Sequence, residues 1–312
     1  MKTLKLLAFL FVLIAAASCG RQGYTMLVGY AQGGRYTVKY NMAGTKITPS
    51  EVQTAIEDIL TDIDTTLSGY NKGSLLSKMN AGLELETNPT FDRVLELSES
   101  FKELTSGAFD HKSAALFDIW GFGFTRDSLP STELINLALE ESRQGKKLNF
   151  NAIAQGFTCD TIASYLHSIG VRDMLVDFGE IYCEGLNPSG KGWAIGIDTP
   201  EDGNNTPGKS ISDVWVSDGK AHGVVTSGNY RKFYIHEGKK YSHTIDPRTG
   251  YPVTNDLLSA TVIAPSAALA DALATAFMVI GTDEAIKFVE SHDDLEACLI
   301  SADSIWRSGG FQ

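Results

Sequence analysis

Two oxygen-bearing side chains interrupt an apolar stretch near the C-terminus of the sequence. Asp271 and Thr275 lie four residues apart within the alanine-rich run of residues 269–280. This spacing places both side chains on one face of a helix, one turn apart. A carboxylate in such a setting needs a positive partner or a set of donors, because an unpaired buried charge is costly. Hard oxygen ligands suit Mg²⁺, which often bridges to substrate phosphates, whereas the alternative is an Asp that caps the helix.

Three further segments combine polar groups with turn or helix-start residues. His243 lies in the polar cluster of residues 241–250, and histidine readily transfers protons near neutral pH, although a structural histidine is the alternative. Residues 105–110 place small residues, an aromatic ring and a carboxylate after a helix end, which suits a flat ring with polar edges. Residues 149–157 predict a helix N-terminus with Gly156 for close backbone approach, and such a site favours anions.

A fourth segment, residues 203–210, matches the phosphate-binding loop of nucleoside triphosphatases letter for letter. Such a loop must leave a strand and open a helix, so that backbone N–H groups face the phosphates. Here acidic residues precede the segment, and the β-like run of residues 211–216 follows it. We therefore expect a polar hairpin loop and no nucleotide site.

The elements that must position these groups are segregated along the chain. Periodicity predicts helices over residues 48–66, 74–79, 89–104, 131–141, 152–169, 266–280 and 283–290. Strand patterns cover residues 26–30, 36–40, 173–178, 181–184, 193–197, 211–216, 223–226, 232–235 and 296–300, and residues 107–129 indicate a packed irregular region. Runs of helices and runs of strands favour an α+β fold over a doubly wound sheet.

The composition excludes several classes of protein. The 312 residues can form one large domain or two modest ones, and 43% hydrophobic residues argue against disorder. With 38 acidic and 26 basic residues the formal net charge is −12, so the average surface repels nucleic acid and anionic lipid. We expect no nucleic-acid partner. A phosphate-bearing ligand would need a metal ion or backbone N–H groups.

The N-terminus predicts a secretory signal peptide. Lys2 and Lys5 precede an apolar run over residues 6–17, which is too short to cross a membrane. The chain after that run resembles a bacterial lipobox, in which lipid is attached to the cysteine, here Cys19, although Ala16 replaces the usual Leu.

The lipobox sets the expected organisation of the whole chain. We expect residues 1–18 to be removed as a lipoprotein signal peptide and residues 19–25 to form a tether. Lipid on Cys19, and not charge, would then hold the protein to the membrane. Residues 26–312 would form a single catalytic domain.

The remaining cysteines are Cys159, Cys183 and Cys298. An odd number cannot complete a disulfide framework, and their spacing matches no zinc pattern. We expect buried thiols.

Several segments of the chain, taken in order, resemble the ApbE family, the FAD:protein FMN transferases. The resemblance covers about Gly29 to Gly281. Its pieces are residues 29–33, 67–70, 74–80, 105–110, 120–123, 152–156, 193–197, 226–230, 242–250 and 270–275. Many ordered matches make the resemblance specific.

The resemblance implies an enzyme outside the cytoplasm that uses Mg²⁺ to split FAD. It would transfer the FMN phosphoryl group to a Thr or Ser hydroxyl of a partner flavoprotein and release AMP. The implied partners are target flavoprotein subunits of membrane electron-transport complexes, and the implied location is the periplasmic side of a bacterial membrane. The implied fold has mixed sheets with packed helices and an active site in a cleft between two subdomains.

The resemblance also assigns roles to individual residues. The metal would be held by the Ala152 backbone carbonyl, the Asp271 carboxylate and the Thr275 hydroxyl, and His243 would lie nearest the proton transfer. The residues implied to contact the flavin nucleotide are Gln32, Tyr70, Ala108, Phe109, Asp110, Asn149, Gln155 and Ile245.

The chain departs from the family pattern at several of these positions. The family commonly has Asp and Lys where this chain has Asn149 and Gln155. It has two successive glycines where residues 178–180 read Phe-Gly-Glu, and Gly-Thr where this chain has Gly33 and Gly34. Two alternatives therefore stand beside the transferase: an FAD pyrophosphatase that gives FMN and AMP, and a non-catalytic FAD-binding lipoprotein.

Overall fold

The structure is a computed structural model. It describes residues 23–121, 129–202, 204, 206, 208–230, 233–236 and 238–311. The expected signal peptide, Cys19 and residues 122–123 lie outside the described residues, so the predictions made for them stay predictions. Within the described part of the chain, no helix is long and apolar enough to cross a membrane.

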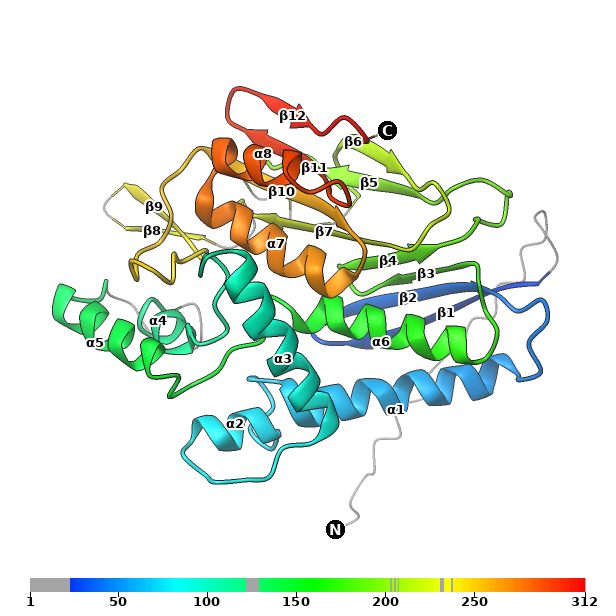
Figure 1. Ribbon diagram of the computed structural model, residues 1–312, viewed down its shortest axis with the longest axis horizontal. Helices are drawn as coiled ribbons and strands as arrows, with labels where there is room; N and C mark the ends of the chain where they lie inside the picture. Colours follow the sequence, from blue (N-terminus) through cyan, green and yellow to red (C-terminus); the bar gives the residue numbers. More distant parts are fainter. Residues whose placement is uncertain are drawn as a thin grey trace, which may run out of the picture.

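An eight-stranded sheet forms the centre of the molecule (Figure 1). Its strands, in spatial order, are β1 (Tyr24–Ala31), β2 (Gly34–Asn41), β3 (Met174–Asp177), β4 (Ile181–Glu184), β7 (His222–Gly228), β10 (Leu257–Ala264), β11 (Glu296–Ser301) and β12 (Ile305–Arg307). Each strand pairs antiparallel with its neighbours. Strands from both ends of the chain thus share one sheet, in agreement with the expected α+β class.

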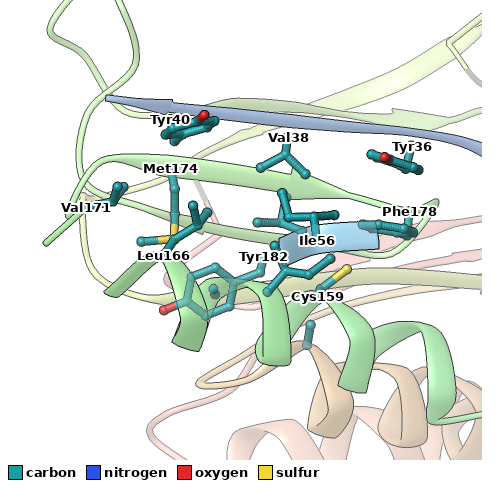
Figure 2. Close-up of a cluster of buried hydrophobic side chains, with 14 of the residues drawn as sticks. Tyr36, Val38, Tyr40, Ile56, Cys159, Leu166, Val171, Met174, Phe178 and Tyr182 are labelled. Carbon is teal, nitrogen blue, oxygen red and sulfur yellow. The ribbon is translucent and has the colours of Figure 1, made fainter. Parts of the chain in front are cut away.

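Helices cover one face of this sheet. They are α1 (Pro49–Leu67), α3 (Pro89–Leu104), α6 (Ala154–Ser168), α7 (Ala267–Ile280) and α8 (Thr282–Glu290), and the short α2 (Leu75–Asn80) follows α1. The alternate residues Tyr36, Val38 and Tyr40 of β2 are buried and pack against this helical layer (Figure 2). Helix α1 begins at a capping box made by Thr48 and Glu51, as its sequence predicted.

Helix α7 is buried almost all round. Ala270, Leu273 and Phe277 pack in the cluster against the sheet, while Ala272 and Ala276 pack in the cluster that includes α3. Small residues allow α7 to fit between these neighbours, and its burial explains why its sequence is apolar on every side.

The opposite face of the sheet is covered by a hairpin of β5 (Ala194–Asp198) and β6 (Ile211–Val216). Trp215 and Ile195 of the hairpin pack with Val224 of β7. The next residue of β7, Val225, packs instead with α7, because successive strand side chains point to opposite faces.

A small lobe projects beside the sheet, at the left of Figure 1. It comprises α4 (Ala114–Ile119), α5 (Thr132–Arg143), β8 (Phe233–His236) and β9 (Lys239–Ser242). Leu116, Ile135 and Ile245 form its buried cluster. The indole N–H of Trp120 donates to the carbonyl of Gly250 at 2.8 Å and ties the lobe to the segment after β9.

Some elements differ from the sequence predictions. The region of residues 107–129, expected to be irregular, contains α4. No strand was predicted for β9, β10 or β12. Strand β1 begins at Tyr24, so it includes the last two residues of the expected tether. Strand β10 is buried on both faces, so it lacks the alternation that marks a half-exposed strand.

Cys159, Cys183 and Cys298 are buried and unpaired, as predicted.

Candidate active site

A cavity of about 870 Å³ lies between the helical layer and the small lobe. Every residue singled out from the sequence as a site residue lines this cavity. They are Gln32, Tyr70, Ala108, Phe109, Asp110, Asn149, Ala152, Gln155, His243, Ile245, Asp271 and Thr275. Their positions agree with the cleft between two subdomains that the family resemblance implied, while the role of each residue stays a prediction.

Helix α7 presents Asp271 and Thr275 to the cavity. Asp271 is only 4% exposed, and its Oδ2 accepts a hydrogen bond from the N–H of Gly156 at 3.2 Å. Burial raises the pKa of Asp271 well above its usual range, and the nearby charge of Glu180 raises that pKa further. An ionised Asp271 therefore needs a cation beside it.

Gly156 lets α6 and α7 approach each other closely. A Cβ at this position would lie 2.3 Å from the carbonyl oxygen of Ala267, well inside van der Waals contact. The absence of a side chain thus brings the start of α6, with Ala152 just before it, to the cavity wall formed by Asp271. The structure confirms the close backbone approach predicted from Gly156.

The ligand set at this wall fits a hard cation. A carboxylate, a hydroxyl and a backbone carbonyl are oxygen ligands, and Mg²⁺ prefers oxygen. The N–H of Gly156, in the first turn of α6, donates to the carboxylate that would bind the ion. Among the described residues, no group of three His, Cys, Asp or Glu side chains could hold a metal ion. The mixed oxygen set is therefore the candidate cation site of that part of the chain.

Residues 105–110 form a tight turn that delivers two buried residues to the cavity. Ser106 and Gly107 adopt positive φ angles of 50° and 78°. The hydroxyl of Thr105 accepts from the N–H of Phe109 at 3.1 Å, which orients the buried ring of Phe109. Next along the chain, the Asp110 carboxylate pairs with Lys102 at 2.7 Å.

His243 lies on a segment that is held on both sides. The hydroxyl of the next residue, Thr244, donates to the side-chain carbonyl of Asn229 at 2.8 Å. The Thr244 carbonyl accepts from the N–H of Val253 at 3.0 Å, and Ile245 forms a β-bridge with Pro252. These bonds fix the backbone that carries His243, so the imidazole lines the cavity from the side of the small lobe.

Neutral amides occupy the places where the family commonly has charges. Gln155 donates from Nε2 to the carbonyl of Phe178 at 3.0 Å, and Asn149 accepts through Oδ1 from the N–H of Asn151 at 2.9 Å. Gln32 has a positive φ of 52°, and its Nε2 donates to the hydroxyl of Thr158 at 2.7 Å. These amides are held by hydrogen bonds and bring no charge to the cavity.

The cavity wall is acidic. Its acidic residues are Asp64, Asp110, Glu180 and Asp271, and no Lys or Arg belongs to the described lining. Asp110 forms an ion pair with Lys102, which lies outside the lining. An anionic ligand in this cavity would be repelled unless a cation accompanied it.

Sequence reasoning missed two of these carboxylates as site residues. Glu180 was noted only as a departure from the family pattern, and Asp64 lies on the polar side of a helix without any motif. The segment Thr226–Ser227–Gly228, quoted from the sequence as part of a polar motif, also lines the cavity, from the end of β7.

The segment that resembles a phosphate-binding loop lies elsewhere. It connects β5 to β6, so it closes an antiparallel hairpin and opens no helix. The N–H of Gly208 donates to Oδ1 of Asp198 at 2.7 Å, which places a carboxylate where a phosphate would bind. The expectation of a polar hairpin loop is confirmed, although residues 203, 205 and 207 lie outside the described residues.

Comparisons of the sequence with known proteins agree with the site. The sequence model of the ApbE family matches residues 33–299. A protein from Haemophilus influenzae, named FAD:protein FMN transferase, is 29% identical over 319 residues, covering 93% of this chain and 91% of its own length. A protein of the same name from Vibrio cholerae is 30% identical, covering 90% of this chain and 89% of its own length.

Solved structures share the fold. The flavin transferase ApbE from Vibrio cholerae superimposes with a TM-score of 0.79 at 28% identity, covering 92% of this chain and 98% of that chain. The apo form of the Pseudomonas stutzeri flavinyl transferase ApbE gives the same TM-score and identity, covering 91% and 94% of the two chains.

Proposed function

Because this chain belongs to the ApbE family, we propose that it is an FAD:protein FMN transferase. The proposal is supported by relatives of that name that match nearly their whole length, and by solved flavin transferases with the same fold. It is also supported by the cavity, which gathers every residue that the family resemblance implied.

One observation carries the proposal that the reaction needs Mg²⁺. The cavity is lined by several carboxylates and by no described Lys or Arg, yet its substrate would carry a pyrophosphate. The Ala152 carbonyl, the Asp271 carboxylate and the Thr275 hydroxyl would hold the ion. Bound there, Mg²⁺ would neutralise pyrophosphate charge and polarise the phosphoryl group.

The chain's own residues would then bind and orient the reactants. Phe109 and Ala108 would contact the flavin ring, with Asp110 at its polar edge, while Gln32, Tyr70, Asn149, Gln155 and Ile245 complete the nucleotide site. His243 would accept the proton of the Thr or Ser hydroxyl at a ring nitrogen. The hydroxyl oxygen bonds to the phosphorus of the FMN half as the bond from that phosphorus to the bridging oxygen breaks. AMP leaves with the bridging oxygen.

The location and the acceptor are part of the same proposal. Removal of residues 1–18 and attachment of lipid to Cys19 would hold the enzyme on the periplasmic side of a bacterial membrane. Flavoprotein subunits of membrane electron-transport complexes would then be within reach as acceptors. Replacing Cys19 with Ala and following incorporation of labelled palmitate tests the anchor; equal labelling of both proteins would contradict it.

One assay tests the activity against its alternatives. The protein is mixed with FAD and Mg²⁺, with and without a candidate acceptor flavoprotein domain. AMP release is then measured, together with covalent flavin fluorescence on a denaturing gel.

A fluorescent acceptor band supports the transferase. AMP release without any acceptor band indicates the FAD pyrophosphatase. Bound flavin with neither product indicates a binding protein.

A further inference from the structure

A buried carboxylate outside the cavity links the two helices that border the cation site. Asp160 lies on α6, one turn after Gly156. Its Oδ1 accepts from the N–H of Ala267 at 2.8 Å, and its Oδ2 accepts from the N–H of Ala268 at 2.9 Å. These N–H groups belong to the first turn of α7, where a helix has no internal acceptors for them.

The start of α7 is therefore capped from two sources. Ser266 is the local cap, and its hydroxyl accepts from the N–H of Leu269 at 3.2 Å. Asp160, on another helix and more than one hundred residues earlier in the chain, accepts from the N–H groups of Ala267 and Ala268. A helix N-terminus favours a negative charge, so the position suits a carboxylate.

Asp160 and Gly156 both form hydrogen bonds with α7, one as acceptor and the other as donor. Asp160 accepts from the backbone of α7, whereas the N–H of Gly156 donates to Asp271 one turn further along α7. The close contact of Gly156 with the Ala267 carbonyl fixes the separation of the helices. Together these contacts leave α7 little freedom to slide or rotate against α6.

We propose that Asp160 is a positioning residue of the cation site. It holds α7, with Asp271 and Thr275, in register with Ala152 at the start of α6. It acts through the backbone of α7, because it does not itself line the cavity. This inference rests on the proposed Mg²⁺-dependent function.

Burial and hydrogen bonding act in opposite directions on the charge of Asp160. Burial raises the pKa of Asp160 to about 6, although the two backbone hydrogen bonds oppose that rise. Ionised Asp160 thus lowers the free energy of unfolding at neutral pH.

The test is the Asp160→Asn variant, which keeps the shape of the side chain. Asn accepts from one of the two N–H groups, but its amide meets the other with a donor. Binding of Mn²⁺ alone, as a Mg²⁺ substitute, is followed by electron paramagnetic resonance. We expect the Kd for Mn²⁺ to rise about tenfold to hundredfold and the KM for Mg²⁺ to rise as well. At saturating Mg²⁺, kcat should change less than the KM does.

Asp173→Asn is the matched control. Asp173 also bridges separate segments, since its oxygens accept from the Leu186 N–H and the Asn41 amide, each at 3.0 Å. It does not line the cavity, so its variant should bind Mn²⁺ as the unchanged protein does. Asp160→Glu, which keeps the charge but shifts it by one methylene, should also weaken Mn²⁺ binding.

Folded Asp160 variants with an Mn²⁺ Kd within twofold of the unchanged protein would overturn the proposal. So would a failure of both variants to fold, since the role would then be structural. Mn²⁺ binding that is weakened in the variants, in a protein that releases no AMP, would leave Asp160 as a positioning residue and refute the proposed function. An unchanged protein that binds no Mn²⁺ would refute both.

Discussion

Two glycine-containing segments, residues 149–156 and 203–210, both have sequences typical of anion sites, but only the first lines the cavity. In each segment a glycine N–H donates to an aspartate. Gly156 donates to Asp271 at 3.2 Å, and Gly208 donates to Asp198 at 2.7 Å. The difference lies in what surrounds the aspartate.

Asp271 belongs to a different helix and forms part of the cavity wall, with Thr275 one turn away. Asp198 ends β5 of the same hairpin, only ten residues before Gly208, so its bond closes a local loop. A helix start becomes a ligand site when a second element brings complementary groups to it. In the hairpin loop, the N–H of Gly208 is already bonded to Asp198 of the same hairpin, so this N–H is not directed at a ligand.

The largest change in turnover should separate the two aspartates when each is replaced by alanine. We expect Asp271→Ala to lower AMP release from FAD by roughly three orders of magnitude or more, because the proposed metal ligand is lost. Asp198→Ala, the matched control, should leave the rate unchanged. Turnover is measured by chromatography of AMP, and equal rates in both variants would refute the assignment of Asp271.

A second variant tests whether His243, on the small-lobe side of the cavity, takes part in flavin transfer. His243→Ala should slow flavin labelling of an acceptor by about 10² to 10⁴, since the acceptor hydroxyl loses the proposed proton acceptor. FAD affinity, followed by quenching of flavin fluorescence, should change little. A comparable loss of labelling and of FAD affinity would indicate a binding role instead.

Asp160 on α6 should also make the free energy of unfolding depend on pH. The pKa of Asp160 is about 6 in the folded protein, above its usual value of 3.8. A raised carboxyl pKa contributes stability at low pH that is lost as pH rises through the folded value. Relative to Asp160→Asn, the unchanged protein should therefore lose about 2 kcal/mol of unfolding free energy between pH 4 and pH 7.

Urea denaturation of both proteins at several pH values measures this difference. A difference that stays constant across the range would contradict the raised pKa.

The smallest effect should come from the hairpin loop. Lys209 takes the place of the lysine that contacts phosphates in a true phosphate-binding loop. Because the loop lies outside the cavity lining, Lys209→Ala should leave FAD turnover within about twofold of the unchanged protein. A large loss of turnover would mean that the hairpin takes part in substrate binding after all.

Sequence patterns predicted amphipathic and capped elements well. Helix α1 has its capping box, and α7 ends at Ile280, the last residue of the predicted helix. The central strand β10 could not be recognised, because a strand covered on both faces shows no alternation. Helix α4 has only six residues, too few for a helical period to emerge from an aromatic, glycine-rich region.

The candidate site was predictable only in part. Asp271 and Thr275 were visible because polar residues at a spacing of four stand out in an apolar run. Asp64 and Glu180 carried no comparable signal, since a polar residue near a helix end or in a turn is ordinary. The acidic character of the cavity emerges only when these residues are brought together.

The sequence by itself determined the oxygen-bearing residue types of the candidate site, the helix starts and the family resemblance, because residue type, spacing and capping act over one or two turns of chain. The tertiary structure alone decided which of the two segments with anion-site sequences lines the cavity. That choice depends on contacts between distant segments, as between Gly156 and Asp271 and between Asp160 and the start of α7. Such contacts join residues more than one hundred positions apart, beyond the reach of any local pattern.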